Sequence, residues 1–341
     1  MNYLFIIQGE GKGHMSQALA LYDRLTVKGD SVNRVCIGAS PQRELPVYIM
    51  DHFGDRIRRF RSPNFIMARD RKGIRPVLTL FYNLLISPVF VRSIVILRKE
   101  IRSPEIDIVV NFYDMIGGLA AFISRSGKKT VVLSHHFFLT GKYFRLPSKP
   151  VLQRVFLKSL NRFSSLGASE IWALSFSRYE NYGRVWIKPP VLRKQVYKLK
   201  PSIGKHILVY LLNPGLIDEI IPVSLQFPQY SFRIYSSANI SSEDIPGNIE
   251  ILEPSESGFL ADLASSRALI TSAGFESQCE GAFLGKPVFT IPSKKHFEQM
   301  CNAVDGKRSG ISFGFDEFDP ELSPDRDSIK KFRDWCSESE W

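Results

Sequence analysis

The segment of residues 267–292 constrains the fold most, because its pattern predicts a strand, a tight turn, a helix and a second strand. An apolar run at 268–270 is typical of a buried parallel strand, and Gly274 closes the turn that follows it. A helix is predicted over 275–284 and the next strand over 288–291. Such a unit belongs to an open α/β sheet, in which helix N–H groups at the carboxyl edge of the strands bind anions.

Acidic and amide side chains follow this turn. Glu276 and Glu280 are four residues apart and therefore share one helix face. Glu276 lies in the first turn, where it either binds a ligand or only complements the helix dipole. Glu280 is one turn deeper, and a carboxylate there can accept from two ribose hydroxyls. Glu298 and Gln299, after the next strand, form an acid and amide pair that suits sugar hydroxyls.

These motifs resemble the donor site of GT-B glycosyltransferases of the MurG and UDP-glycosyltransferase type, families 28 and 1. The resemblance implies that Gly274 and Ser277 contact the donor diphosphate, that Glu280 holds the ribose, and that the acid and amide pair reaches the donor sugar. Asn302 and Ala303 continue the family pattern. The expected donor-facing residues are Gly274, Phe275, Glu276, Ser277, Glu280, Glu298 and Gln299, with Asn213 and Gly215 after another predicted strand.

The resemblance implies an α/β protein with the GT-B fold, in which two doubly wound Rossmann-like domains face each other across a cleft. Alternating strand and helix patterns predict an N-terminal acceptor-binding domain over 1–190. A proline-containing linker is expected over 191–203, and the nucleotide-sugar-binding domain over 204–323. The remaining residues, 324–341, are expected to form a helix that crosses back to the first domain, as in GT-B folds.

A glycine-rich loop follows the first predicted strand, with Gly9, Gly11, Gly13 and His14. A dinucleotide fingerprint would place the third glycine one residue later, where His14 stands, and a Walker A loop would need Ser or Thr after Lys12. The spacing instead fits the Gly-x-Gly-x-Gly-His loop of MurG-like transferases. The resemblance therefore places Gly11 and Gly13 on the acceptor side.

The chemistry is expected to be inverting and independent of an obligatory metal. Retaining GT-B enzymes often carry a second Glu eight residues before the ribose Glu, but Ser272 stands there. An inverting enzyme needs one general base. His14 is the first choice because imidazole titrates near neutral pH, and the alternative is that His14 only caps the helix. Related sequences often carry Arg three residues later, where this chain has Gln17.

Two further motifs carry alternatives. His135 and His136 follow a strand predicted over 129–134, so they either bind the acceptor or only structure the loop. Asp325 and Asp327 form a DxD string, the metal signature of the other glycosyltransferase fold, but at a helix start, where capping is the simpler interpretation.

Charge and composition restrict the partners. The 341 residues carry a net charge of +11, which favours phosphorylated ligands or anionic lipid. Nucleic acid is not expected, because the chain lacks lysine runs, zinc-finger spacing and RNP-like aromatics. Four scattered cysteines fit a reducing cytoplasm.

An arginine-rich segment over 54–75 precedes an apolar segment over 76–97. The apolar segment predicts two helices that are broken at Pro88 and packed mostly on the sheet. The arginine-rich segment is either a solvated loop or, with the apolar helices, a peripheral contact to the inner face of an anionic membrane.

The sequence therefore predicts a glycosyltransferase that moves a sugar from a nucleoside diphosphate, favoured to be UDP, to a lipid-linked or envelope glycan. The nucleotide sugar is expected as a substrate, with no obligatory cofactor. Two alternatives remain at this point: a sugar-nucleotide 2-epimerase-like enzyme, and a protein that binds sugar nucleotides without catalysis.

Overall fold

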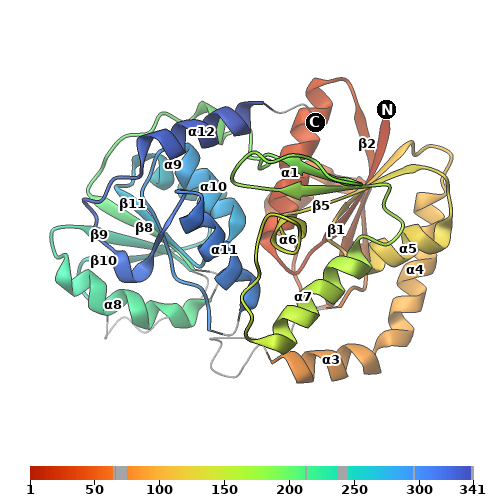
Figure 1. Ribbon diagram of the computed structural model, residues 1–341, viewed down its shortest axis with the longest axis horizontal. Coiled ribbons are helices and arrows are strands. Elements are labelled where there is room, and N and C mark those ends of the chain that lie inside the picture. The colour runs from red at the N-terminus through yellow and green to blue at the C-terminus, as the bar shows by residue number, and fades with distance from the viewer. Residues whose placement is uncertain (64–65, 67–74, 212, 237–244, 295, 339–341) are drawn as a thin grey trace. The chain divides into compact units, whose positions relative to one another are not determined.

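The computed structural model in Figure 1 describes residues 1–63, 66, 75–211, 213–236, 245–294 and 296–338. The chain forms two compact units. Within the described residues, unit 1 comprises Met1–Ile66 and Arg75–Arg193, and unit 2 comprises Lys194–Glu338.

Unit 1 contains a parallel sheet with the strand order β3-β2-β1-β4-β5-β6-β7. Its strands are β1 Asn2–Gln8, β2 Ser31–Gly38, β3 Ile57–Phe60, β4 Ile108–Phe112, β5 Lys129–Ser134, β6 Glu170–Leu174 and β7 Val185–Lys188. The order reverses between β1 and β4, where Phe5 pairs with Val110. In such sheets ligands bind at the carboxyl ends of the strands beside this reversal. The loops after β1 and β4 therefore frame the candidate site of unit 1.

Helices of unit 1 cover both faces of this sheet (Figure 1). The helices of the unit are α1 Lys12–Val27, α2 Val47–Phe53, α3 Pro76–Leu85, α4 Ser87–Ile101, α5 Met115–Ser124, α6 His136–Leu139 and α7 Val151–Ser164. Helix α3 contacts α4. Helix α4 buries Phe90, Leu97 and Ile101, whose spacing places them on one helix face, in a core shared with Leu4 and Ile6 of β1. This packing fixes β1, and with it the glycine-rich loop that follows.

Unit 2 repeats the architecture with the strand order β10-β9-β8-β11-β12-β13, again parallel. Its strands are β8 His206–Tyr210, β9 Ser231–Tyr235, β10 Ile249–Leu252, β11 Ala268–Thr271, β12 Val288–Thr290 and β13 Phe313–Gly314. Its α-helices are α8 Ile217–Gln226, α9 Glu256–Ser265, α10 Phe275–Phe283, α11 Phe297–Arg308 and α12 Arg326–Ser337. The order reverses between β8 and β11, where Tyr210 pairs with Thr271.

Two sequence-based expectations for residues 54–97 need correction. Part of the arginine-rich segment is the edge strand β3, which pairs with β2; Arg58 and Arg59 on this strand hid its alternation with buried Phe60. The apolar pair does form two helices, but only α4 packs on the unit. Helix α3 leaves Phe81 and Leu84 exposed, so the expectation that the pair packs mostly on the sheet is wrong for α3.

The predicted linker is held by both units rather than extended in solvent. Val191 and Leu192 are buried, and the division between the units falls at Arg193. Ser202 donates its N–H to Ala264 O at 2.9 Å and accepts from Lys286 Nζ at 2.5 Å. The end of the linker is therefore fixed to unit 2.

Helix α12 begins after Asp325, whose Oδ2 accepts from Ser328 N at 2.8 Å, so the predicted capping role is confirmed. The helix packs against α10, and Arg333 Nε donates to Phe283 O at 2.6 Å. The expectation that this helix crosses back to the first domain concerns the placement of the two units and stays a prediction.

Candidate functional site

The turn between β11 and α10 is the best-defined feature of unit 2. Ala273 adopts a left-handed conformation, with φ of 57°. Asn302 Nδ2, from α11, donates to Ala273 O at 3.0 Å and holds this turn. Gly274 is the N-cap of α10, and no side chain in the described residues caps the helix by a hydrogen bond. The first N–H groups of α10 therefore remain for an anion, as the sequence predicts for Gly274.

Ser277 and Gln278 stabilise the turn from inside the helix. Ser277 Oγ donates to Gly274 O at 3.1 Å and lies 2.7 Å from Thr271 Oγ1. Gln278 Nε2 donates to Gly274 O at 3.3 Å, while its Oε1 accepts from Ser312 Oγ at 2.8 Å. Because the single Ser277 hydroxyl proton is used within the turn, its predicted contact with the diphosphate falls to the backbone N–H. Gln278 was missed, since a buried amide inside a helix gives no sequence signal.

The two predicted carboxylates of α10 differ in burial. Glu280 is 4% exposed and Glu276 is half-buried, while Phe275 is buried at the helix start. This burial separates Glu280 from Glu276, which the sequence could not do. The predicted contact of Glu280 with the ribose hydroxyls stays a prediction.

The acid and amide pair lies in the first turn of α11. His296 caps this helix, because its Nδ1 accepts from Gln299 N at 3.4 Å. Gln299 is buried and its Oε1 accepts from Ser293 N at 2.7 Å, which fixes the amide plane. Glu298 is half-buried. Orienting Gln299 through its oxygen leaves its NH₂ group as the donor available for a sugar hydroxyl.

A second turn at the same sheet edge follows β8. Asn213 Oδ1 accepts from Gly215 N at 3.1 Å, so these two predicted residues form one turn. Asn213 is 3% exposed, and its Nδ2 has no hydrogen-bond partner among the described residues. Since β8 pairs with β11, the Asn213 turn and the Gly274 turn both follow strands at the reversal point.

The glycine-rich loop of unit 1 is closed by local hydrogen bonds. Gln8 Oε1 accepts from Gly11 N at 3.3 Å, and Gly9 N donates to Gly38 O at 2.8 Å. A side chain at Gly9 would clash with Ile37, because its Cβ would lie 2.7 Å from Ile37 Cγ2. At Gly11, by contrast, a Cβ would meet nothing within 4 Å. Gly11 thus borders open space at the start of α1, and its acceptor-side role stays a prediction.

Three aromatic rings meet at the carboxyl edge of unit 1. The His14 ring, in the first turn of α1, lies 5.5 Å from the Tyr113 ring and 5.8 Å from the His136 ring, measured between centroids. Tyr113 and His136 stack at 4.0 Å. Tyr113 follows β4 with φ of 63°, an uncommon conformation for a tyrosine. Its position after a strand beside the reversal was the sequence signal that could have identified Tyr113.

His14 also has a polar partner in its own helix. Its Nδ1 lies 3.3 Å from Oε1 of Gln17, which is buried one turn later. If Nδ1 donates to this oxygen, the other ring nitrogen, Nε2, carries the lone pair. Gln17 therefore favours the tautomer in which Nε2 can accept a proton.

The two adjacent histidines after β5 have different surroundings. His136 Nδ1 lies 2.6 Å from Ser134 Oγ, and Asn161 Nδ2 donates to the His136 carbonyl at 2.8 Å. His135 is buried, with Nδ1 2.7 Å from Leu174 O and its ring stacked on Phe138. The geometry brings His136, and not His135, to His14.

Lys12 is a cation of this loop that the sequence analysis did not single out as a ligand. Burial lowers the pKa of Lys12, and the nearby Arg43 guanidinium lowers it further. Two cations that disfavour each other beside an uncapped helix N-terminus are suited to a shared anion.

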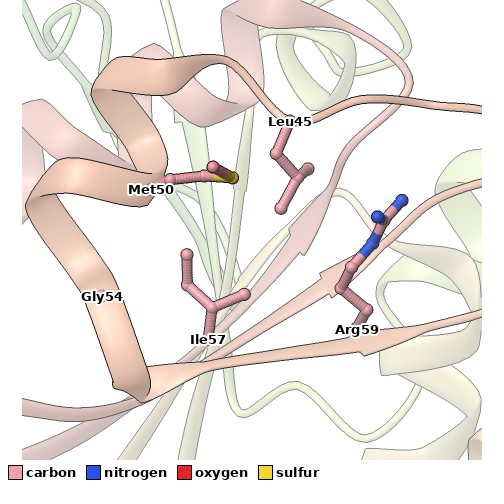
Figure 2. Close-up of a pocket in the computed structure, with 5 residues that line it drawn as sticks. All are labelled: Leu45, Met50, Gly54, Ile57 and Arg59. Atoms are coloured by element: carbon pink, nitrogen blue, oxygen red, sulfur yellow. The ribbon is translucent and has the colours of Figure 1, made fainter.

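A cavity of about 370 Å³ lies elsewhere in unit 1, between α2 and β3, and Figure 2 shows its lining. Leu45, Met50, Gly54, Ile57 and Arg59 line it. Its one charged group, Arg59, donates to the backbone carbonyl of Arg43 at 2.5 Å. The cavity does not include any predicted site residue, and its chemistry offers no acid, base or nucleophile. Among the described residues, no three His, Cys, Asp or Glu side chains are grouped as metal ligands.

Two parallel, doubly wound sheets of this kind form the GT-B fold. The fold is similar to that of the kitacinnamycin glycotransferase (TM-score 0.60, 14% identity, 98% of this chain and 94% of that chain). It is also similar to that of Phytolacca americana UGT2 complexed with UDP-2-fluoro-glucose and pterostilbene (TM-score 0.62, 12% identity, 99% of this chain and 94% of that chain). Acinetobacter baumannii MurG is similar as well (TM-score 0.56, 15% identity, 99% of this chain and 95% of that chain).

The chain belongs to glycosyl transferase family 1, whose model matches residues 1–332. A relative from Methanosarcina acetivorans, described as an uncharacterized glycosyltransferase, is 25% identical in an alignment of length 331 that covers 89% of this chain and 81% of that protein. The protein is therefore a glycosyltransferase, and the predicted enzyme class and fold are confirmed.

Proposed function

We propose that this glycosyltransferase moves a sugar from a UDP-linked donor to an anionic, lipid-linked or envelope glycan acceptor, with inversion and without an obligatory metal. The observation that carries the donor assignment is the turn after β11, where an uncapped helix N-terminus stands in front of the buried carboxylate of Glu280. Anion and diol recognition are thereby combined within two turns of one helix.

In this proposal, the diphosphate is bound by the N–H groups at Gly274 and the start of α10, with the Asn213 amide as a further donor. Glu280 accepts from the ribose hydroxyls, and Gln299 with Glu298 reads the donor sugar. The complex of Phytolacca americana UGT2 with UDP-2-fluoro-glucose supports a UDP donor, because that protein has the same fold.

The chemical step is a direct displacement. The acceptor oxygen attacks the anomeric carbon, the bond from that carbon to the diphosphate oxygen breaks, and its electron pair leaves with UDP. The acceptor proton passes to His14 Nε2, the nitrogen that the contact between Nδ1 and Gln17 leaves as acceptor. Tyr113 and His136 are the ring neighbours of His14 and are proposed to position it and the acceptor.

The acceptor is proposed to be anionic because Lys12 begins α1 and the Arg43 guanidinium is near enough to lower the pKa of Lys12. They supply the positive charge that related sequences place three residues after the histidine, where this chain has Gln17. A phosphate-bearing lipid carrier has this chemistry, and such an acceptor would place the enzyme at the inner face of the membrane.

The test is to incubate the protein with a panel of nucleotide sugars and a lipid extract, and to identify products by mass spectrometry. Release of UDP with a glycosylated product supports the proposal. Interconversion of the sugar would indicate an epimerase, and a thermal shift without turnover would indicate a binding protein. His14→Ala should lower turnover by roughly a hundredfold or more and leave UDP affinity unchanged. The matched control is His52→Ala, a histidine of the same unit on α2.

If His14→Ala retains wild-type turnover at saturating acceptor, His14 is not the base. His136, its ring neighbour, would then be substituted next, followed by His135.

A further inference from the structure

Helix α3 and the start of α4 expose a large apolar surface on unit 1. The exposed fractions are 59% for Phe81, 68% for Leu84 and 64% for Leu85 on α3. Val91 and Val95 on α4 are exposed to a similar degree. We refer to these five side chains as the apolar face. Isolated exposed apolar residues are ordinary, but a group of this size within two consecutive helices marks an interaction surface.

Helix α4 packs on unit 1, and α3 contacts α4. Within the described residues, no single helix is long and apolar enough to span a bilayer; α3 and α4 together meet that length and composition but are bent by 67°. Helix α4 buries Phe90, Leu97 and Ile101 in the core, packed on α5. A helix anchored along one side in this way is suited to lie in an interface plane.

The exposed charges on the two helices have one sign. The exposed charged residues of 75–102 are Arg75, Arg92, Arg98, Lys99 and Arg102. The one acid in this range, Glu100, is half-buried and lies 3.5 Å from Arg34. An apolar face on two helices whose exposed charged side chains are all basic is complementary to an anionic lipid surface, where basic side chains meet lipid phosphates.

The same asymmetry holds for the whole chain. Residues 1–193 contain 30 Lys and Arg against 13 Asp and Glu, a net charge of +17. Residues 194–341 contain 15 against 21, a net charge of −6. The basic character therefore belongs to the half that carries the apolar face, and not to the half that is proposed to bind the anionic donor.

The sequence predicts lipid contact through the arginine-rich segment together with its apolar neighbour, and the apolar part of that surface lies on α3 and α4. Arg56 is engaged with Tyr22 OH and with His52 O, and Arg59 with Arg43 O. Other arginines of that segment, at positions 69 and 71, lie outside the described residues.

We propose that the apolar face of α3 and α4 docks on an anionic lipid bilayer, with its side chains in the acyl boundary and the exposed arginines of the two helices on lipid phosphates. A second copy of the chain is disfavoured as the occupant, because a symmetric pairing would bring the same basic side chains from both copies together. This inference rests on the exposed side chains of α3 and α4 and does not depend on the proposed transfer reaction. Combined with the proposed transfer, it favours an acceptor carried at the membrane.

The test is flotation of the purified protein with phosphatidylcholine vesicles that contain or lack phosphatidylglycerol, at low and high salt. The wild type should bind the anionic vesicles at low salt and lose most of this binding at high salt, because surface charges are screened over about 8–10 Å at physiological ionic strength. The combined variant Phe81→Ser, Leu84→Ser, Leu85→Ser should lower the partition coefficient roughly tenfold or more. Arg92→Glu and Arg98→Glu should each lower it at least about fivefold.

Matched controls are Ile203→Ser and Leu225→Ser, which remove equally exposed apolar side chains from unit 2 and should leave vesicle binding unchanged. UDP affinity, measured on every variant, verifies the fold and tests the donor site separately. Retained vesicle binding by the triple Ser variant overturns the proposal. So does a wild-type protein that ignores anionic vesicles but forms a dimer that the triple variant abolishes, which would assign the face to a second copy.

Discussion

Substituting Asn302 by Asp should show that the turn between β11 and α10 is held by one buried hydrogen bond. Asn302 is fully buried, its Nδ2 donates to Ala273 O, and its Oδ1 has no partner in the described part of the chain. Asp keeps the size of the side chain but cannot donate when ionised. The change therefore leaves the Ala273 carbonyl unsatisfied and places a charge in the core, which together should lower the free energy of unfolding by roughly 2–4 kcal/mol.

The loss should extend to binding. A left-handed alanine costs roughly 1–2 kcal/mol, so the turn at Ala273 persists only while a contact such as that from Asn302 holds it. UDP affinity should fall at least about fivefold at a temperature where the variant remains folded. Urea denaturation and calorimetry with UDP measure the two effects.

The matched control is Asn181→Asp, because Asn181 Oδ1 accepts from Ile187 N at 2.8 Å and a carboxylate retains this bond. That variant should be nearly as stable as the wild type. If the free energy of unfolding of Asn302→Asp lies within about 0.5 kcal/mol of the wild-type value and its UDP affinity is normal, the role of this bond is refuted.

Three further predictions concern specificity, metals and pH. Gln299→Ala should raise the donor KM and relax discrimination between hexoses while changing turnover less, as measured with epimeric UDP-sugars; an unchanged preference would remove Gln299 from sugar recognition. EDTA should not abolish activity; loss that magnesium or manganese restores would redirect attention to Asp325 and Asp327. Burial raises the pKa of Asp114 from 3.8 to about 6, so the folded state retains a proton that the unfolded state releases, and the free energy of unfolding should fall as pH rises from about 4 to 6. Asp114→Asn should remove that component, about 3 kcal/mol by linkage, and an identical pH dependence of the variant would contradict it.

The fold was largely predictable because buried parallel strands are apolar runs. The predicted strands 129–134 and 170–174 coincide with β5 and β6. Strands β3 and β7 were missed because each lies at a sheet edge, where Arg58 or the exposed Trp186 interrupts the apolar pattern.

The site was predictable where a motif fixes both residue type and position. Gly274 and Glu280 lie on the turn and helix as expected, and Asn213 shares its turn with Gly215. Tertiary partners could not be predicted, because they depend on which elements meet. The stacking of Tyr113 on His136 is of this kind.

The central claim is that the β11–α10 turn with Glu280 forms a UDP site, and calorimetric titration of UDP into wild-type protein and Glu280→Gln tests it most directly. The substitution preserves size and removes the charge that accepts two ribose hydroxyls, so affinity should fall by about 1–3 kcal/mol, or roughly fivefold to 150-fold. Glu256→Gln, which removes a carboxylate from the first turn of α9 in the same unit, should bind UDP like the wild type. Equal UDP affinity of the wild type and Glu280→Gln would contradict the account.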